Sequence, residues 1–369
     1  MKPTMYLDIP TIGVTGSFGK TTVKEITASI LATKYNTYKS PKNFNLPNKT
    51  REHVEDITDK HEAVVIEMAM SKKGRGKKQC TVIQPSIGVI TAIGHAHFER
   101  FSSIEDVAKS KSEMMKYMKQ DGILLLNNDD DNSKLINTKY FPGKIIKVGR
   151  TAGSDYVASN ISYNRDGMTF DVKLNGKSES MFINLLGEHS VINSLFGIAI
   201  ADQLDVTADQ IREGLKEVNL PRGRLTVDNF EGNRTLVDDS YNANPASMIS
   251  GLNVLNDFVS SKRKIALLGD MVEMGNYTKE GHEKVGSSLV NYNLDQVYLF
   301  GESSKYIREK AIEVGFPKEK LIHYDDIEQL INAINEAFSE DTALLVKASR
   351  ATNLKRVVDF LLKNYKSIH

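Results

Sequence analysis

A short stretch near the start of the chain has the residue types needed to hold the phosphates of a nucleotide. It reads Gly16-Ser17-Phe18-Gly19-Lys20-Thr21-Thr22 and joins an apolar run at 11–15 to an amphipathic segment at 21–34. In such a strand-to-helix turn, backbone N–H groups cradle phosphate, the lysine reaches the β and γ phosphates, and the threonine hydroxyl binds Mg²⁺. ATP or GTP binding is therefore predicted. The strict pattern has glycine where Val14 stands, so a plain glycine turn with a surface lysine is the alternative.

A carboxylate later in the sequence is predicted to lie beside the phosphate loop. Glu67 follows the apolar run Ala63-Val64-Val65-Ile66, which has the length of a buried strand. Ligands gather at the carboxyl ends of strands in open α/β sheets. Glu67 is therefore a candidate Mg²⁺ ligand, and the alternative is a solvated glutamate at a strand end.

The elements that must position these residues follow an alternating pattern. Short Val/Ile/Leu runs alternate with helix-length amphipathic segments, which is typical of βα units around a mainly parallel sheet. The expected strands are 11–15, 63–68, 86–93 and 122–126, and the expected helices are 21–34 and 104–118.

The stretch 155–186 has a different pattern. Its residues alternate, and the turn pairs Asp166-Gly167 and Asn175-Gly176 predict antiparallel strands that form a β-rich edge of the first domain. Helices are expected at 189–204 and 208–218, before the loop Leu220-Pro221-Arg222-Gly223-Arg224. We place the domain boundary in that loop, with a central nucleotide-binding domain at 1–222 and a C-terminal domain at 223–369.

The second half repeats the alternation and predicts a doubly wound, Rossmann-like α/β domain. Its expected strands are 235–237, 264–268, 296–300 and 343–346, and its expected helices are 247–258, 280–292, 304–314, 327–338 and 354–362. The fold class is thus α/β throughout.

The composition excludes several classes of function. The chain has 369 residues with 48 basic and 47 acidic side chains, so its net charge of +1 provides no overall field for nucleic acid or an anionic membrane. The single cysteine, Cys80, cannot form an intrachain disulfide or a zinc cage. We expect a cytoplasmic protein with neither nucleic-acid nor membrane partners, and the sequence does not predict its oligomeric state.

Several motifs occur together and in a fixed order. They are Thr15-Gly16-Ser17-Phe18-Gly19-Lys20-Thr21-Thr22, Glu67-Met68-Ala69-Met70, Gly94-His95-Ala96-His97-Phe98-Glu99, Ala108-Lys109-Ser110-Lys111-Ser112-Glu113, Asp238-Asp239-Ser240-Tyr241-Asn242-Ala243-Asn244-Pro245 and Leu268-Gly269-Asp270-Met271. With this set, the chain resembles the Mur ligases over nearly its whole length, most closely the branch that adds D-alanyl-D-alanine. The resemblance implies an enzyme that uses ATP to convert a carboxylate into an acyl phosphate, which an amine attacks to give an amide, ADP and phosphate.

The resemblance also implies cofactors, namely ATP and two Mg²⁺ ions. Transfer of a phosphoryl group to a carboxylate brings anions together, so the site must supply cations. The implied catalytic residues are Lys20, Glu67, His97, Lys111 and Arg224, and the implied metal ligands are Thr21, Glu67, His97 and Lys111. Lys111 matches a lysine that reacts with CO₂ to form a carbamate, and the alternative is an exposed helix lysine. His95 matches the family pattern less well than His97 does.

Further residues match family positions that contact the nucleotide or the second substrate. The implied ATP-binding residues are Thr15, Gly16, Ser17, Phe18, Gly19, Lys20, Thr21, Thr22, Asn193, Arg224, Asp239, Tyr241, Asn242 and Asn244. The implied substrate residues are Asn43, Asn45, Lys347, Ser349 and Arg350. Departures are Ser190 where asparagine is usual and Ala348 where glycine is usual.

The start of the chain departs most from the family. The phosphate loop follows a strand at 11–15, so we expect this chain to lack the family's N-terminal UDP-binding domain and to use small molecules: a carboxylate acceptor without a UDP anchor and an amino acid or dipeptide amine. The basic run 72–78 could bind an anionic acceptor or be a solvated loop. The alternatives are a cell-wall precursor ligase that adds D-alanyl-D-alanine, and a non-catalytic nucleotide-binding scaffold or switch.

Overall fold

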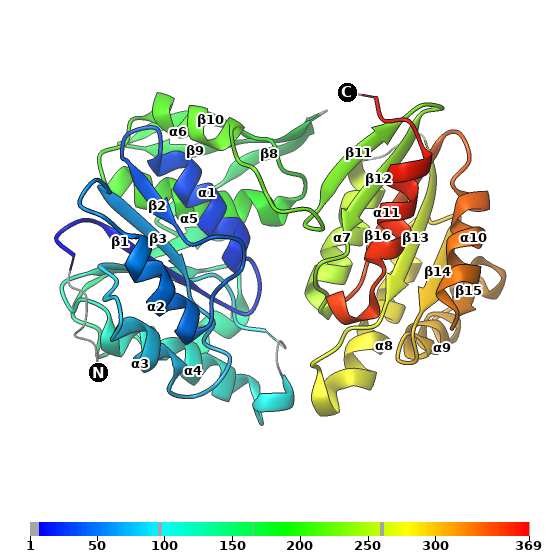
Figure 1. Ribbon diagram of the computed structural model, residues 1–369, viewed down its shortest axis with the longest axis horizontal. Helices are drawn as coiled ribbons and strands as arrows, with labels where there is room; N and C mark the ends of the chain where they lie inside the picture. Colours follow the sequence, from blue (N-terminus) through cyan, green and yellow to red (C-terminus); the bar gives the residue numbers. More distant parts are fainter. Residues whose placement is uncertain (1–6, 95–97, 165, 259–261, 369) are drawn as a thin grey trace. The chain divides into compact units, whose positions relative to one another are not determined.

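The computed structural model describes residues 7–94, 98–164, 166–258 and 262–368 (Figure 1). The described residues of Met1–Gly94 and Arg100–Asn219 form one compact unit, and those of His95–Glu99 and Leu220–His369 form a second. Each unit has its own sheet and its own core, so each is described by itself.

The first unit is built on a seven-stranded sheet in which the paired strands are parallel. The strands in spatial order are β2 (Thr37–Lys39), β3 (Ala63–Glu67), β1 (Thr11–Thr15), β4 (Ile87–Ile90), β5 (Ile123–Asn127), β6 (Lys144–Gly149) and β7 (Tyr156–Val157). β1 and β3 are buried along their whole length because helices cover both faces. The predicted parallel α/β sheet is confirmed.

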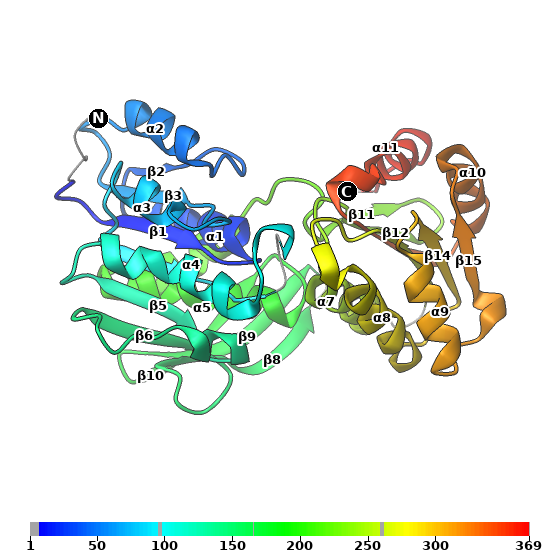
Figure 2. The same cartoon turned by 90° about the horizontal axis from the view of Figure 1, so that it is seen from below.

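Helices flank this sheet in two groups (Figure 2). α1 (Lys20–Leu31) packs against α5 (Glu188–Gln203) and α6 (Ala208–Lys216), whereas α3 (Arg75–Cys80) packs against α4 (Ile104–Tyr117) and α2 (Pro47–Asp56). The connection after β1 thus enters the first group, and the connections after β3 and β4 enter the second. A crevice forms at the carboxyl ends of strands where connections diverge in this way, and this is where the phosphate loop lies.

The predicted β-rich edge is a separate three-stranded antiparallel sheet in the order β10-β9-β8. Its strands are β8 (Ser159–Asn164), β9 (Gly167–Leu174) and β10 (Lys177–Ile183). Buried Phe170 and Val172 alternate with outward-facing residues on β9, as expected for a half-buried strand.

The second unit has a six-stranded mixed sheet in the order β11-β12-β16-β13-β14-β15. The strands are β11 (Thr226–Phe230), β12 (Arg234–Asp239), β13 (Arg263–Gly269), β14 (Gln296–Phe300), β15 (Leu321–Tyr324) and β16 (Thr342–Lys347). β11 pairs antiparallel with β12, and the other pairs are parallel. The sequence pattern did not predict the antiparallel edge strand or β15.

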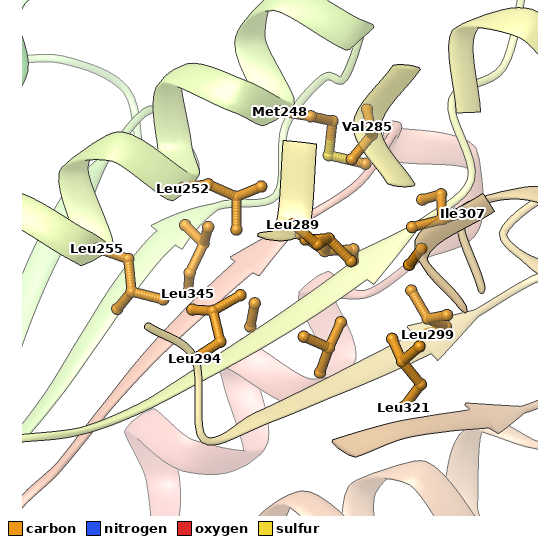
Figure 3. Packing of buried hydrophobic residues seen from close by; sticks show 14 of the residues in the cluster. Met248, Leu252, Leu255, Val285, Leu289, Leu294, Leu299, Ile307, Leu321 and Leu345 are labelled. Carbon is orange, nitrogen blue, oxygen red and sulfur yellow. The ribbon is translucent and has the colours of Figure 1, made fainter. Parts of the chain in front are cut away.

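Two hydrophobic clusters lie on opposite faces of that sheet. Successive residues of β13 alternate between them: Ala266 and Leu268 join one cluster, and Ile265 and Leu267 join the other. Figure 3 shows the first cluster, where Met248 and Leu252 of α7 (Pro245–Phe258) and Leu345 of β16 meet side chains of α8 (Thr278–Ser288) and α9 (Lys305–Glu313). The second cluster packs under α10 (Ile327–Ala337) and α11 (Lys355–Asn364).

Within the described ranges, no helix combines the length and the apolar character needed to cross a membrane.

Candidate nucleotide and metal site

The phosphate loop follows β1 and requires glycine at two positions. Gly19, which caps α1, has a φ of 80°, in the left-handed region that favours glycine. Gly16 has a φ of 151°, and a Cβ there would lie 1.9 Å from the Thr91 hydroxyl oxygen. Both positions therefore exclude larger residues and bring the backbone close to whatever the loop holds.

Side-chain hydrogen bonds fix the loop to the segment that follows β4. The Ser17 hydroxyl donates to the Gly94 carbonyl and accepts from the Gly94 N–H, each at 2.9 Å. The Thr91 hydroxyl donates to the Phe18 carbonyl at 2.5 Å. The loop is thus held open by its neighbours before any ligand binds.

Three side chains from separate parts of the sequence meet beside the loop. The Thr21 hydroxyl donates to one carboxylate oxygen of Glu67 at 2.8 Å, and the Asn45 amide donates to the other at 2.7 Å. Glu67 is only 1% exposed, at the end of β3. A threonine hydroxyl and a carboxylate are hard oxygen ligands of the kind that Mg²⁺ prefers, so this pair fits that ion.

Lys20 spans the loop from the first turn of α1. Its ammonium donates to the carbonyls of Gly16 at 3.0 Å and Ser17 at 3.2 Å. The charge therefore lies against the backbone of the loop that the sequence predicts to hold phosphates.

Lys111 on α4 is 3% exposed, and its ammonium has one long contact, to the Met70 carbonyl at 3.5 Å. Burial lowers the pKa of Lys111 well below its usual value, and the nearby Lys20 charge lowers the pKa further. A lysine in this environment carries more neutral amine than a surface lysine. The alternative of an exposed helix lysine is wrong, because α4 turns this side chain inward.

Other predicted residues of the first unit lie at or near the loop. A Cβ on Gly19 would lie 2.9 Å from the Asn193 amide oxygen, so Asn193 on α5 touches the loop. Asn43 is half-buried, two residues before Asn45. His95 and His97 lie outside the described residues.

The predicted residues of the second unit surround the end of β12. The Arg224 guanidinium stacks over the Tyr241 ring at 4.2 Å from its centroid. Within the described part of the chain, the buried Nε of Arg224 has no hydrogen-bond partner. An orphaned buried donor is uncommon in native structures.

Lys347 and Asp239 form a largely buried ion pair in this unit. The ammonium of Lys347 lies 2.5 Å from an Asp239 carboxylate oxygen and also donates to the Asn242 carbonyl at 3.1 Å. Burial raises the pKa of Asp239, while the charges of Lys347 and Arg224 act in the opposite direction. The pair links β12 to β16 and holds the loop after β12.

Asn244 and Ser349 also have partners within the protein. Asn244 precedes α7, where its amide oxygen accepts from the Ser247 N–H at 2.9 Å and the Ser247 hydroxyl accepts from the Asn244 N–H at 3.0 Å. The Ser349 hydroxyl accepts from the Val272 N–H at 2.9 Å. Arg350 is exposed.

Sequence reasoning missed two residues that shape the loop. Thr91 follows β4 and bonds the loop carbonyl, and the carboxylate of Asp130 accepts from the Ile93 N–H at 2.7 Å. Burial raises the pKa of Asp130. Their position in the sequence could have identified them, because both are polar residues that follow shortly after apolar runs of strand length.

Comparison with known proteins identifies the family. The model of the Mur ligase middle domain matches residues 14–201, and the model of the Mur ligase glutamate ligase domain matches residues 223–350. The chain belongs to the Mur ligase family. It is therefore a ligase by family, as predicted from its motifs.

Individual Mur ligases match along most of the chain. The UDP-N-acetylmuramoyl-tripeptide–D-alanyl-D-alanine ligase of Bacillus subtilis is 30% identical over 96% of this chain and 76% of its own length. The crystal structure of MurF from Acinetobacter baumannii has a TM-score of 0.87 at 26% identity, covering 96% of this chain and 77% of that one. MurF ligase from Thermotoga maritima in complex with ADP has a TM-score of 0.83 at 27% identity, covering 96% and 80%. The predicted two-part α/β fold is confirmed.

Proposed function

We propose that this protein is an ATP-dependent, ADP-forming ligase that joins a carboxylate and an amine through an acyl phosphate. The observation that carries the proposal is the contact between Thr21 and Glu67 at the phosphate loop, because these two oxygen ligands would hold Mg²⁺ there. The ADP complex of the related ligase from Thermotoga maritima supports nucleotide binding. Membership in a ligase family favours the enzyme over a non-catalytic scaffold.

The chain's residues account for the first half of the reaction. A carboxylate oxygen of the acceptor attacks the γ phosphorus, an O–P bond forms, and ADP leaves with the electrons of the broken bond. Lys20 stabilises charge on the transferred phosphoryl group, as lysines of phosphate loops do. Mg²⁺ held by Thr21 and Glu67 would neutralise charge on the β and γ phosphates.

The second half is the attack of the amine on the acyl carbon. A C–N bond forms, phosphate leaves with the C–O bonding electrons, and the amine nitrogen releases a proton. We propose that Arg224 binds phosphate, because its guanidinium is always charged and its Nε has no hydrogen-bond partner among the described residues. Asp239, Tyr241, Asn242 and Asn244 would shape the loop that meets the nucleotide.

We infer that Lys111 is converted to a carbamate. The amine nitrogen attacks CO₂, an N–C bond forms, and one proton is released. No described acidic side chain forms an ion pair with this lysine, which is buried with only a long carbonyl contact. A carbamate would supply the missing negative charge and an oxygen ligand for a second Mg²⁺, together with His97. Incubation with ¹³C-bicarbonate should give a carbamate carbon resonance that is absent in Lys111→Ala.

For the substrates, the names of the relatives give the first pair to test. We propose D-alanyl-D-alanine as amine and UDP-N-acetylmuramoyl-tripeptide as acceptor, in line with the Bacillus subtilis ligase. The sequence-based preference for an acceptor without UDP stays a prediction. Lys347, Ser349 and Arg350 remain the proposed contacts to the amine substrate, and Asn43 and Asn45 those near the acceptor.

The test is phosphate release from Mg-ATP with this pair, and in parallel with a small-metabolite extract plus amino acids, with mass spectrometry of any new amide. We expect a product mass that names both substrates. Lys20→Ala should lower the turnover by about 100-fold or more, because it removes a preorganised charge. Lys60→Ala, an exposed lysine of the same unit, serves as the control. Nucleotide binding without substrate-dependent phosphate release would contradict the proposal.

A further inference from the structure

We propose that a basic pocket in the first unit binds a polyanionic part of the carboxylate acceptor. The pocket has a volume of about 330 Å³ and is lined by Leu46–Asn48 at the start of α2, by Lys72–Arg75 and by Lys78. This proposal rests on the proposed function, since it names the chemical class of that ligase's acceptor. A volume of this size suits a small-molecule group.

Four of the lining residues carry positive charge, and none carries negative charge: Lys72, Lys73, Arg75 and Lys78. Within the described residues, none of the three lysines forms an ion pair. Arg75 donates to the Ser71 hydroxyl at 2.5 Å, and its pKa is lowered by burial and then by the charge of Arg100. Like charges that gather without counter-ions repel one another, so a bound polyanion would stabilise the pocket.

The carboxylate of Glu113 bonds the backbone of this wall and forms no ion pair with the pocket lysines among the described residues. Glu113 on α4 accepts from the N–H of Gly74 at 2.6 Å and from the N–H of Gly76 at 3.0 Å. A Cβ on Gly76 would lie 2.5 Å from the Glu113 Cβ, so glycine permits this close approach. The wall with Lys72, Lys73 and Arg75 is thereby fixed against α4.

Each wall of the pocket lies next in the sequence to a segment that contacts the candidate site. One wall starts after Asn45, whose amide binds Glu67 and whose carbonyl accepts from Gln79 at 2.6 Å. The other starts after Met70, whose carbonyl accepts from Ser110 at 3.1 Å and from Lys111. The two walls are thus joined through Asn45 and Met70 to Glu67 and Lys111 of the candidate site.

The chemistry of the pocket selects an acceptor with two or more negative charges. Phosphate oxygens and clustered carboxylates both meet this requirement, since lysine binds either as a point charge. The basic run 72–78 forms a turn followed by the start of α3, and Lys72, Lys73 and Lys78 are exposed where they line the pocket.

The test measures binding of two probes, inorganic pyrophosphate and the tricarboxylate tricarballylate, by calorimetry with the phosphate loop saturated by ADP. The variant is the double substitution Lys72→Ser and Lys73→Ser. The matched control is Lys77→Ser, since Lys77 is exposed in the same basic run but does not line the pocket. We expect the double variant to lose about tenfold or more in affinity, with weaker binding of the unsubstituted protein at high salt.

The outcomes distinguish phosphate from carboxylate as the bound anion, and they can overturn the proposal. Binding of pyrophosphate alone identifies phosphate as the anion, and binding of tricarballylate alone identifies carboxylates. The proposal fails if neither probe binds, if the double variant keeps full affinity, or if Lys77→Ser loses as much. Because these titrations need no turnover, they fail independently of the ligase assay. In that assay, the double variant should raise the KM for an active acceptor and leave kcat nearly unchanged.

Discussion

The polar residues of the two units differ in what they bind. In the first unit, Thr21 and Asn45 both donate to Glu67 at the end of β3, and Lys111 is buried with no ion pair to a described residue. In the second unit, Lys347, Asp239, Asn244 and Ser349 have partners that belong to the fold itself. The comparison teaches that substitutions in the first unit should mainly impair chemistry, whereas those of Lys347, Asp239 and Asn244 in the second should also impair stability.

The sharpest test of the first half of this comparison is Lys111→Ala. We expect ligation to fall by about 100-fold or more, because a charge that stabilises the reacting groups is lost. Short carboxylic acids such as acetate should restore part of the activity by replacing the carbamate. Lys109→Ala, an exposed lysine on the same helix, is the control. Full activity of unrescued Lys111→Ala would remove this residue from the site.

The largest stability effect is expected from Lys347→Met. Removing one partner of a buried ion pair leaves the other charge uncompensated, which costs about 3–5 kcal/mol. Combining it with Asp239→Asn should recover part of that loss, as measured by chemical denaturation. Lys366→Met breaks an exposed pair with Glu231 and should leave the Tm unchanged. If Lys347→Met kept full stability, the expected difference between substitutions in the two units would be wrong.

A buried histidine should make the second unit sensitive to acid. His282 is fully buried on α8, where Nε2 accepts from the Met271 N–H at 3.0 Å and Nδ1 donates to the Thr278 carbonyl at 2.7 Å. Burial lowers the pKa of His282 in the folded state. The unfolded chain therefore binds the proton first, so this contribution to stability is lost as the pH falls below about 6.5.

The variant His282→Gln isolates that effect. At neutral pH it should be less stable by about 1–3 kcal/mol, because one glutamine amide cannot replace both ring nitrogens, which bond the Met271 N–H and the Thr278 carbonyl. The difference from the unsubstituted protein should narrow as the pH falls to about 5.5, because only the histidine titrates there. Urea unfolding at both pH values measures it. A difference that stays constant with pH would show that protonation of His282 does not cause the loss of stability in acid.

The smallest effect is expected from Asn244→Ala. Loss of a helix N-cap costs about 1 kcal/mol, and thermal unfolding measures it. The steady-state KM for ATP should remain close to that of the unsubstituted protein if Asn244 acts only as the cap of α7. A large rise in that KM would instead place Asn244 at the nucleotide, as its motif predicts, and would weaken the distinction between the units.

Local patterns were sufficient to predict much of the fold. The apolar runs predict β1, β3, β4 and β5, and helical periodicity predicts α1 and α4, because both periods depend on neighbouring residues. The short elements β2, α2 and α3 were missed, since their residues are mostly polar and their stability comes from packing. β11 was missed as well, although its partner β12 follows after a short turn, because its residues are mostly polar and only partly buried.

By itself, the sequence determined where the phosphate loop lies, since glycines at 16 and 19 followed by Lys20 and Thr21, between a strand and a helix, form a local pattern. Tertiary structure decided which strand ends are neighbours, and so joined Thr21 to Glu67 across 46 residues and Asn45 to the same carboxylate. Tertiary structure also buried Lys111 and gathered the positively charged residues that line the pocket. The physical reason is that sheet order and burial depend on long-range packing, which a local pattern of residues does not contain.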